Sequence, residues 1–555
     1  MAEKEESSVG VEGGKGKVDL DTILVEELGQ FGWFQARTLA LAAVIVIFAG
    51  VAASEFVFTT ARINHRCLIP ECESERPGEF APDWILNAVP ADGSSFASCE
   101  RFANGSVAVT DPGSCPANIF DRDTVLDCES FVYENTYTVV YDFELACQEW
   151  LRSLIGSVHI FGTLTAMPIT GYVSDRWGRR TALTIFAFVR GCFGFVRSWA
   201  DSYVLFIVLH FLQATFGFGA FSCAYILVME LMGPKYRVVG GATVNTFFAV
   251  GKVCAGLLAW AVPHWRQLHR AIYAPMFICI IYYWIMPESV RWYMSKGRYA
   301  ESEAVLKEAA RINGTELSTA SLTALRESEE EAKRKKELEE IERAKEPLLI
   351  VQVFRNKQIL LRCLVTPVWW VTYTFVYYGL SINAVNMSGN RYVNYVAVSA
   401  VEIPGYWTAV LLLGKIGRKP VLIIAFWLCS ACQIAYIFMP EGYEGLSLAV
   451  YLIGMTCIAM VITSVYVYTT ELYPTKYRHS LFAFSSMVGR IGSVLAPLTP
   501  AMGASTWEQL PFALFGGFAL LSGCLVFILP ETLGAKFPDT MEEAAQIGNK
   551  KQERT

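Results

Sequence analysis

Glu55, Lys252, Glu402 and Arg490 are ionisable side chains inside long apolar stretches of the sequence, where His159, Arg190 and His210 also stand. A charge inside a membrane-spanning helix costs roughly 2.5–3.5 kcal/mol on insertion scales, so each is treated first as a functional residue. A guanidinium binds a carboxylate through two parallel hydrogen bonds, and a carboxylate binds a cation. We therefore expect these side chains to bind a charged small molecule. The alternative is an internal ion pair between Glu55 or Glu402 and Lys252 or Arg490.

Aromatic side chains form a second group with binding chemistry. Trp370, Tyr373 and Tyr377 stand at i, i+3 and i+7, which places them on one face of a helix. An aromatic face holds a quaternary ammonium group with about 0.5–2 kcal/mol per contact. Packing, or a belt at the membrane surface, is the alternative role. The predicted substrate site comprises Arg490, Glu402, Lys252, Tyr377, Tyr373, Trp370 and Glu55.

Apolar runs long enough to cross a bilayer must position these residues. Hydrophobic side chains make up 53% of the 555 residues, and charged ones 18% against about 25% in soluble proteins. A spanning helix needs roughly 20 mostly apolar residues because its backbone must satisfy its own hydrogen bonds in lipid. Twelve runs qualify, near 38–59, 153–173, 181–199, 203–229, 239–262, 271–287, 360–381, 392–413, 420–439, 446–468, 480–502 and 509–529. The sequence predicts an all-α polytopic membrane protein.

Basic residues in the short loops predict its orientation. Ten of them fall on one side: Arg176, Arg179, Arg180, Lys235, Arg237, Lys415, Arg418, Lys419, Lys476 and Arg478. The opposite loops carry Arg197, Arg266, Arg270 and Arg391. Because basic loops stay in the cytoplasm, we expect residues 1–37, 288–357 and 531–555 there, and residues 61–148 outside the cell.

The segment 61–148 carries six cysteines: Cys67, Cys72, Cys99, Cys115, Cys128 and Cys147. An even number of cysteines in an exported segment predicts disulfides, and six cysteines allow 15 pairings. Asn104-Gly105-Ser106 matches the acceptor pattern for N-glycosylation.

A repeat relates the two halves of the chain. Residues 230–237 (Glu-Leu-Met-Gly-Pro-Lys-Tyr-Arg) and 471–478 (Glu-Leu-Tyr-Pro-Thr-Lys-Tyr-Arg) share five of eight positions at an offset of 241. Asp175–Arg180 and Gly414–Lys419 are a weaker pair, and Pro287-Glu288-Ser289 recurs as Pro530-Glu531-Thr532. We infer a duplication of six helices into halves 38–287 and 358–530. Parallel repeats of this kind are typical of transporters that bind substrate midway through the membrane.

These motifs carry a family resemblance. Asp175–Arg180 resembles the loop signature of the major facilitator superfamily, and Pro287–Trp292 and Glu471–Thr475 resemble its sugar-porter and organic-ion branch. The six-cysteine segment, together with Phe31–Gln35, Pro263–Arg266 and Val401–Pro404, is similar to solute carrier family 22, the organic cation, anion and carnitine transporters. The resemblance implies the major facilitator fold with twelve membrane helices, and secondary transport by alternating access.

The resemblance also implies residue roles. Cation transporters of the family have an aspartate where Arg490 stands, and anion and carnitine transporters tend to have arginine, which favours an anionic or zwitterionic substrate. A gating role is implied for Asp175, Arg179, Glu230, Arg237, Glu471 and Arg478. The family usually carries an arginine three residues before a glutamine in the fourth helix; here His210 precedes Gln213. A proton role and a packing role are both open for that histidine.

Other classes of function are weighed against this one. An organic cation remains an alternative substrate because Glu55, Glu402 and the aromatic residues could bind one. A receptor or sensor that binds ligands without moving them is an alternative of another class. The net charge of −6 offers no basic surface for nucleic acid, and no enzyme, cofactor or metal motif is found. We expect an integral plasma-membrane protein, in contact with lipid, that is driven by a proton, sodium or an exchanged solute.

Overall fold

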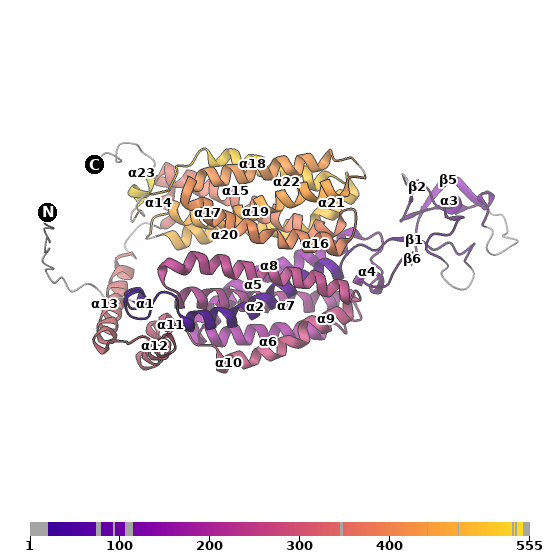
Figure 1. Ribbon diagram of the computed structural model, residues 1–555. Helices are drawn as coiled ribbons and strands as arrows, with labels where there is room; N and C mark the ends of the chain where they lie inside the picture. The colour runs from indigo at the N-terminus through magenta and orange to yellow at the C-terminus, as the bar shows by residue number, and fades with distance from the viewer. Residues whose placement is uncertain are drawn as a thin grey trace, which may run out of the picture.

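Two bundles of long helices lie side by side, with a small strand-containing region at one end (Figure 1). The computed structural model describes residues 20–73, 79–92, 95–105, 115–343, 348–440, 442–475, 477–534, 538 and 541–547. We call the end that carries α1 (Leu20–Glu26) and α23 (Met541–Gln546) the terminal end, and the opposite end the loop end.

The first bundle is formed by the N-terminal half of the chain. Its helices are α2 (Trp33–Thr59), α5 (Glu149–Trp177), α6 (Arg179–Arg197), α7 (Tyr203–Leu231), α8 (Arg237–Ala261) and a sixth segment made of α9 (Trp265–Tyr273), η3 (Ala274–Ile281) and α10 (Tyr282–Ile285). A short turn, η2 (Pro234–Tyr236), precedes α8. Each of the first six predicted apolar runs falls on one of these segments.

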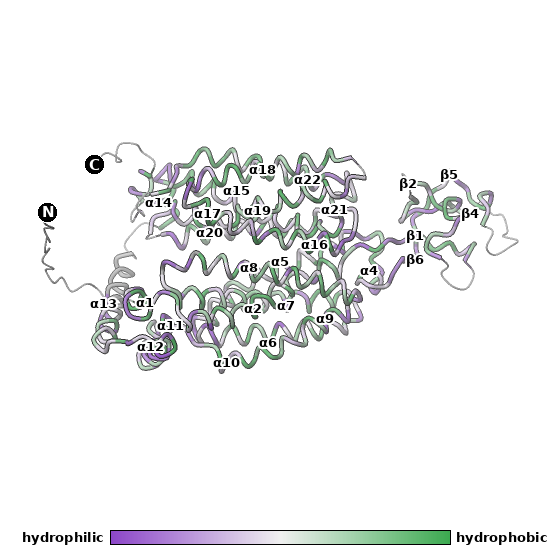
Figure 2. Tube along the Cα trace, in the orientation of Figure 1, coloured by the Kyte–Doolittle hydropathy of each residue, from purple (hydrophilic) through white to green (hydrophobic). Residues whose placement is uncertain are grey.

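The second bundle repeats the pattern. It contains α15 (Lys357–Asn383), α16 (Arg391–Ala400) followed by α17 (Glu402–Ile416), α18 (Arg418–Ile437), α19 (Glu444–Leu472), α20 (Arg478–Leu495) followed by η5 (Ala496–Leu498) and α21 (Thr499–Ser505), and α22 (Leu510–Val526). The turn η4 (Ala384–Asn386) follows α15. The predicted twelve-helix membrane protein is confirmed, and ten of the described helical segments are long and apolar enough by themselves to cross a membrane. Green apolar residues run along both bundles (Figure 2).

Short helices cover the terminal end. Between the bundles the chain forms α11 (Val290–Ser295), α12 (Tyr299–Asn313), α13 (Thr319–Arg343) and α14 (Leu349–Arg355). The helix α1 packs against α12 and α13, because buried Leu20, Ile23 and Leu24 share a hydrophobic core with Leu306 and Leu325.

The region at the loop end is not helical bundle but paired strands. Strand β1 (His65–Cys67) pairs antiparallel with β6 (Phe131–Tyr133), β2 (Ala91–Asp92) with β3 (Ser95–Phe96), and β4 (Glu100–Asn104) with β5 (Phe120–Asp127). Short helical turns complete it, namely α3 (Ile85–Ala88), η1 (Ala117–Ile119) and α4 (Val139–Asp142). The all-α prediction therefore holds for the bundles and not for this region.

Three disulfides hold the strands together: Cys67–Cys128, Cys72–Cys115 and Cys99–Cys147. All six cysteines predicted to pair do so. Cys67, Cys72 and Cys115 are buried in a small core of their own with Ile69 and Val89. A region this small buries little apolar surface, so cross-links supply stability that its core lacks.

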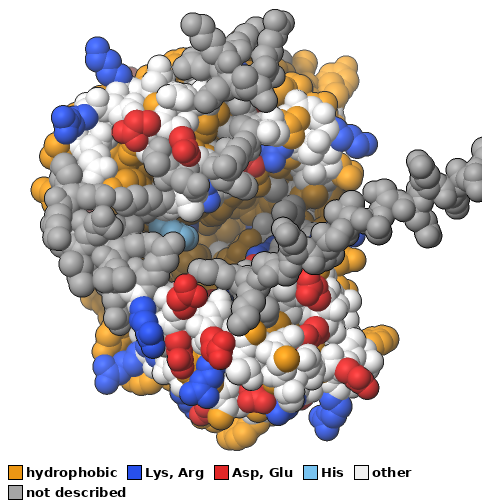
Figure 3. All heavy atoms as spheres, turned by 90° about the vertical axis from the view of Figure 1, so that its left-hand side faces the viewer, with side chains coloured by type: hydrophobic (Ala, Val, Ile, Leu, Met, Phe, Trp, Pro, Cys, Tyr) orange, Lys and Arg blue, Asp and Glu red, His pale blue; other side chains and the backbone are white. Residues whose placement is uncertain are grey.

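The two bundles pack against each other at the loop end. Phe58 of α2 and Trp260 of α8 both stack on Tyr392 of α16, at centroid distances of 5.7 Å and 6.1 Å. The hydroxyl of Ser157 donates to the carbonyl of Val494 across the same interface, at 3.0 Å. The face at the terminal end is hollowed between the bundles and lined by hydrophobic side chains (Figure 3). The structure is thus closed at the loop end and open at the terminal end.

Candidate functional site

A buried ion pair joins the two halves near the middle of their interface. Lys252 of α8 contacts the carboxylate of Glu402, which is the first residue of α17. The ammonium of Lys252 also donates to the hydroxyls of Tyr377 at 3.2 Å and Ser381 at 3.1 Å. Tyr377 and Tyr406 donate to the second carboxylate oxygen of Glu402, at 2.8 Å and 3.1 Å. The carboxylate is 0% exposed, so every partner it has is a protein group.

Arg490 of α20 forms a different kind of site. Its guanidinium lies 5.6 Å from the ring centre of Phe218, which belongs to α7 of the other half. Tyr373, Tyr378 and Tyr466 lie next to it. No carboxylate among the described residues forms an ion pair with Arg490, and its side chain is half-buried by solvent accessibility. Arg490 is therefore a cation between the halves that protein charge does not neutralise.

The three predicted aromatic residues lie in three different environments. Tyr377 belongs to the ion pair, and Tyr373 lies beside Arg490. Trp370 instead packs within the second half: its indole N–H donates to Thr469 at 3.2 Å, and its ring meets Phe482 edge-on at 5.1 Å. The structure therefore places Trp370 behind the site rather than at it.

Tyr378 and Tyr466 were missed by the sequence analysis as site residues. Tyr466 lies 4.6 Å from the ring of Trp370, is 40% exposed, and interacts electrostatically with Tyr225 of the first half. Tyr225 and Tyr466 each stand five residues before a repeated glutamate, so the repeat was the signal that could have found Tyr466, and the signal for Tyr378 was its place beside Tyr377.

Glu55 of α2 lies in a separate cluster, inside the first half. Its carboxylate pairs with Arg197 and accepts from His269 at 2.8 Å, Tyr273 at 3.2 Å and Thr59 at 3.3 Å. Glu55 and Arg197 side chains are both 0% exposed. Glu55 is not brought together with Lys252, Glu402 or Arg490. Both glutamates therefore form internal ion pairs, which was the predicted alternative to substrate binding. The partner of Glu402 is Lys252, as considered, and the partner of Glu55 is Arg197, which was not considered.

Arg197 was predicted to lie in an outer loop, and this is wrong. Arg197 is the last residue of α6, and its side chain turns into the bundle because Glu55, His210 and Gln213 offer it acceptors. A guanidinium from α6 therefore lies beside His210 and Gln213 of α7. Gln213 accepts from Arg197 at 2.9 Å and donates to Tyr273 at 2.8 Å. The described contacts of His210 are those of a packed, hydrogen-bonded residue.

At the terminal end of the first half, three of the predicted gating residues come together. Arg179 bonds Asp175 at 2.9 Å and lies 3.5 Å from Glu230. Glu230 also accepts from the hydroxyl of Ser289. Glu288 accepts the backbone N–H of Arg179 at 2.9 Å, at the start of α6. Burial raises the pKa of the Glu288 carboxyl, and the backbone donors only partly offset this.

The second half repeats the arrangement with its equivalent residues. Arg418 forms a two-pronged contact with Glu471, at 2.8 Å and 2.9 Å. Thr532 donates to the same carboxylate at 2.6 Å. Glu531 accepts the backbone N–H groups of Arg418 and Lys419 at 3.0 Å and 2.9 Å, at the start of α18. Burial opposes its ionisation, but these backbone donors prevail and lower the pKa of Glu531.

The last two predicted gating residues lie apart from these clusters. Arg237 bonds Asp21 of α1 at 2.5 Å, and Arg291 shares that carboxylate. Arg478 donates to Thr475 at 3.1 Å. Lys476, which the sequence analysis counted among the basic loop residues, lies outside the described residues. The glutamates Glu288 and Glu531 were not predicted as site residues, although their repeated Pro-Glu-Ser and Pro-Glu-Thr motifs were the available signal.

The bundles, the repeated clusters and the charges between the halves define a membrane transporter of the major facilitator fold. Comparison with solved structures agrees: the inward-open xylose transporter XylE from E. coli aligns with a TM-score of 0.61 and 14% identity, over 91% of this chain and 98% of that one. The xylose transporter bound to a bromo-deoxyglucose aligns with a TM-score of 0.59 and 15% identity, over 93% of this chain and 99% of that one.

Sequence comparison gives the family. The profile described as "Sugar (and other) transporter" matches residues 122–544, and the chain belongs to that family. An organic cation transporter protein of Drosophila melanogaster is 29% identical over 95% of both chains. Organic cation/carnitine transporter 2 of Homo sapiens is 28% identical over 95% of this chain and 94% of the relative. Solute carrier family 22 member 4 of Mus musculus is 28% identical over 94% of both. These relatives confirm the resemblance to solute carrier family 22.

Proposed function

We propose that this transporter moves a small organic ion that carries a carboxylate, and that Arg490 binds that carboxylate. The observation that carries the proposal is the absence of a carboxylate partner for Arg490 among the described residues. A guanidinium in a partly buried, low-dielectric site attracts an anion far more strongly than one in water. The substrate would supply the charge that the protein does not.

The other charges of the predicted site support this assignment. Glu402 is neutralised by Lys252, and Glu55 by Arg197. A cationic substrate at Glu402 would have to displace Lys252 from a carboxylate that is fully enclosed. An anion at Arg490 would displace no carboxylate among the described residues. The central site therefore favours an anionic group over a cationic one.

A zwitterion fits the surroundings of Arg490 best. Tyr373 and Tyr466 offer aromatic faces beside the guanidinium, and such faces bind quaternary ammonium groups. The relatives named as organic cation and carnitine transporters agree with a substrate that carries an onium group. A carnitine-like molecule, with a carboxylate at one end and an ammonium at the other, would use both features.

We further propose that halves 38–287 and 358–530 rock about this site. The clusters at Arg179–Glu230 and Arg418–Glu471 lie at the terminal end, where the halves are apart. In this open state the charged residues of each cluster pair with residues of their own half. When the terminal end closes, these charges and those of Asp175, Arg237 and Arg478 are available to pair across the interface.

Orientation follows from the charge distribution. The terminal end carries nine of the ten basic loop residues among those described, so we place it in the cytoplasm with the central segment 288–357 and both terminal segments, 1–37 and 531–555. The disulfide-bonded segment 61–148 then faces the outside of the cell, in the plasma membrane. A proton, sodium or an exchanged solute would drive transport.

A second candidate is an organic cation carrier. It is favoured by the buried carboxylate of Glu402, which the hydroxyls of Tyr377 and Tyr406 hold in place and which would bind a cation that displaces Lys252. A non-transporting receptor is the third. Repeated gate clusters in both halves favour transport, since a static receptor has no use for them.

Uptake into cells tests these alternatives. We would compare radiolabelled carnitine, para-aminohippurate and tetraethylammonium in the wild type and in Arg490→Gln, with Arg391→Gln as a control that removes a charge elsewhere in the same half. Uptake of carnitine or hippurate that fails only in Arg490→Gln supports the proposal. Uptake of tetraethylammonium alone, equal in all three proteins, supports the cation carrier. Saturable binding without flux supports the receptor.

A further inference from the structure

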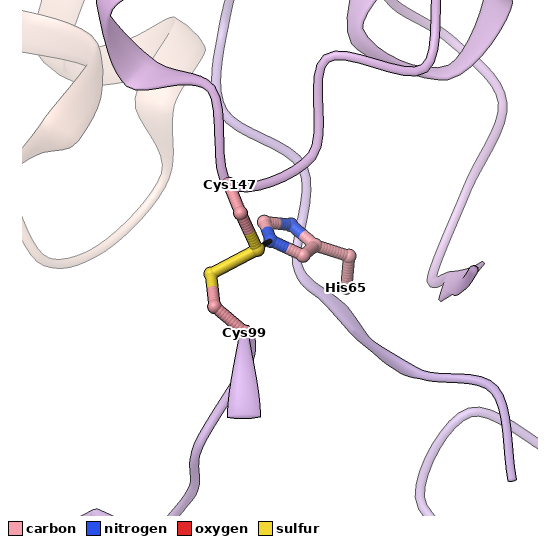
Figure 4. Close-up of side chains that lie close together, drawn as sticks. All are labelled: His65, Cys99 and Cys147. Atoms are coloured by element: carbon pink, nitrogen blue, oxygen red, sulfur yellow. Dashed lines mark hydrogen bonds between the residues drawn. A yellow bond between two sulfur atoms is a disulfide. The ribbon is translucent and has the colours of Figure 1, made fainter. Parts of the chain in front are cut away.

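A histidine and a disulfide meet at the junction between the strand-containing region and α5. His65 of β1 points its ring at the Cys99–Cys147 disulfide (Figure 4). Its Nε2 lies 3.4 Å from the sulfur of Cys147 and 3.9 Å from that of Cys99. The three candidate ligand atoms all lie within 4.8 Å of one another. The other two disulfides have no histidine contact among the described residues.

The hydrogen bond on the other side of the ring fixes the tautomer. Nδ1 of His65 lies 2.9 Å from the backbone carbonyl oxygen of Ile63. A carbonyl oxygen only accepts, so in the neutral ring Nδ1 carries the hydrogen and Nε2 presents its lone pair to the sulfurs. A ring held by one backbone carbonyl, with its other nitrogen free, is the usual arrangement of a metal-binding histidine. His65 is 3% exposed, so packing holds the ring in this orientation.

We propose that reduction of Cys99–Cys147 creates a zinc site made of the two thiolates and Nε2 of His65. Zinc binds thiolate at about 2.3 Å and imidazole at about 2.0–2.1 Å in a tetrahedron, which separates a nitrogen from a sulfur ligand by about 3.6 Å. The two observed distances lie on either side of that value. The sulfurs must separate to about 3.8 Å, and rotation of the exposed Cys147 side chain allows this.

The step balances with a phosphine or thiol as reductant. A phosphine breaks the sulfur–sulfur bond, takes oxygen from water to become the phosphine oxide, and leaves two thiols. Each thiol then loses its proton to solvent as Zn²⁺ binds the thiolates and the imidazole. A water molecule completes the tetrahedron, because Cys147 is open to solvent.

Burial makes this disulfide the first to be reduced. Cys147 is exposed and Cys99 half-buried, whereas Cys67 and Cys115 are fully buried in the other two bridges. Thiol–disulfide exchange and phosphine attack both require access to a sulfur. A limiting amount of phosphine should therefore open Cys99–Cys147 selectively.

The test uses the full chain in detergent, treated with limiting phosphine and then titrated with Zn²⁺ alone. We expect one Zn²⁺ bound per protein after reduction and none before, and at least a tenfold weaker affinity in His65→Ala. Alkylation and mass spectrometry should find Cys99 and Cys147 as the free thiols. Reduction of another bridge first, or equal zinc affinity in wild type and His65→Ala, would overturn the proposal.

A second variant removes the need for a reductant, in case reduction unfolds the region. Cys99→His cannot form the bridge but keeps three ligands around the same point. It should bind one Zn²⁺ without phosphine, and the double change Cys99→His/His65→Ala should not. Failure of Cys99→His to bind zinc, together with failure of the reduced wild type, would show that the geometry does not hold a metal.

Discussion

Lys252 and Glu402 form a buried ion pair that joins the two halves of the transporter. Lys252 stands on α8, and Arg490 stands on α20, the equivalent helix of the second half. Each cation reaches toward the opposite half: Lys252 to Glu402, and Arg490 to the ring of Phe218. The duplication has thus placed two cations in related positions and neutralised one of them. The charge that remains is the basis of the proposed anion site.

Replacing one member of the Lys252–Glu402 pair should destabilise the protein strongly. Removing one partner of a buried pair leaves an uncompensated charge and costs about 3–5 kcal/mol, whereas replacing both by apolar residues is often neutral. We expect Lys252→Met and Glu402→Met to lower the melting temperature and the double variant to recover most of it. Fluorescence-detected size exclusion after heating measures this. A double variant no more stable than the singles would contradict a direct pairing.

Replacing Gly178 or Gly417, which occupy equivalent positions in the two halves, should destabilise the protein for the same reason. Gly178 and Gly417 have φ of +96° and +99°, and a side chain there would also meet the carboxylates of Glu288 and Glu531. Alanine at either position should cost about 1–3 kcal/mol and reduce transport. Gly171→Ala and Gly414→Ala are matched controls, since nothing lies within 4 Å of a Cβ at those positions. Similar melting temperatures for all four variants would contradict the account.

The equivalent glutamates Glu288 and Glu531 should respond to pH in opposite directions. The pKa of Glu531 is lowered in the folded protein, so its contribution to stability is present above about pH 4.5 and is lost as pH falls below that. The pKa of Glu288 is raised, so its contribution is full below about pH 4.5 and declines as pH rises through its folded pKa.

Melting temperatures between about pH 3 and pH 8 measure the difference between wild type and each glutamine variant, since the contribution of Glu531 is lost only below about pH 4.5. The difference for Glu531→Gln should shrink on acidification, and that for Glu288→Gln should grow. Other titrating groups cancel because they are common to both proteins being compared. If the difference in melting temperature changed with pH in the same way for both variants, the pKa values of Glu288 and Glu531 would not be shifted in opposite directions, and the prediction would be wrong.

Arg197 should not tolerate lysine. A single ammonium cannot contact Glu55, His210, Gln213 and His269 in the directions that the guanidinium does. We expect Arg197→Lys to cost about 3–5 kcal/mol, as for a broken buried pair. Arg270→Lys is the control, because Arg270 bonds one hydroxyl, that of Ser198, in a half-buried place. Equal surface expression and stability of both variants would contradict the buried network.

Glycosylation at Asn104 tests the orientation. Asn104 is exposed at the end of β4, and glycans are added only to segments outside the cytoplasm. The wild type should shift in size on treatment with an N-glycosidase, and Asn104→Gln should not carry that shift. Protection of the described loop-end region from impermeant labels would contradict the proposed orientation.

The bundles could be predicted from the sequence because lipid imposes a simple rule. Each spanning helix needs an apolar run of a set length, and each of the twelve runs became a helical segment. The repeats of Glu230 with Glu471 and of Glu288 with Glu531 also indicated the duplication. The structure adds the contacts of Glu288 and Glu531, which accept backbone N–H groups at the starts of α6 and α18.

Side-chain partners could not be predicted in the same way. Arg197 stands at the end of an apolar run, where a loop position and a buried position look alike in sequence. Its direction depends on acceptors from α2 and α7, which only packing brings together. The disulfide pairing is similar, because the choice among 15 patterns depends on which strands lie adjacent. Trp370 shares a helical face with Tyr373, but the neighbouring helices of its own half cover it.

The most direct test of the central claim compares a carboxylate substrate with its uncharged amide. Initial uptake of each would be measured in the wild type, Arg490→Asp and Arg391→Asp, corrected for protein at the surface. If Arg490 binds the carboxylate, the wild type prefers the acid. Arg490→Asp then lowers uptake of the acid by about 100-fold, which corresponds to about 2.7 kcal/mol, and leaves the amide nearly unchanged. Arg391→Asp changes neither. An equal loss of acid and amide in Arg490→Asp would show that Arg490 supports the fold and does not bind the substrate.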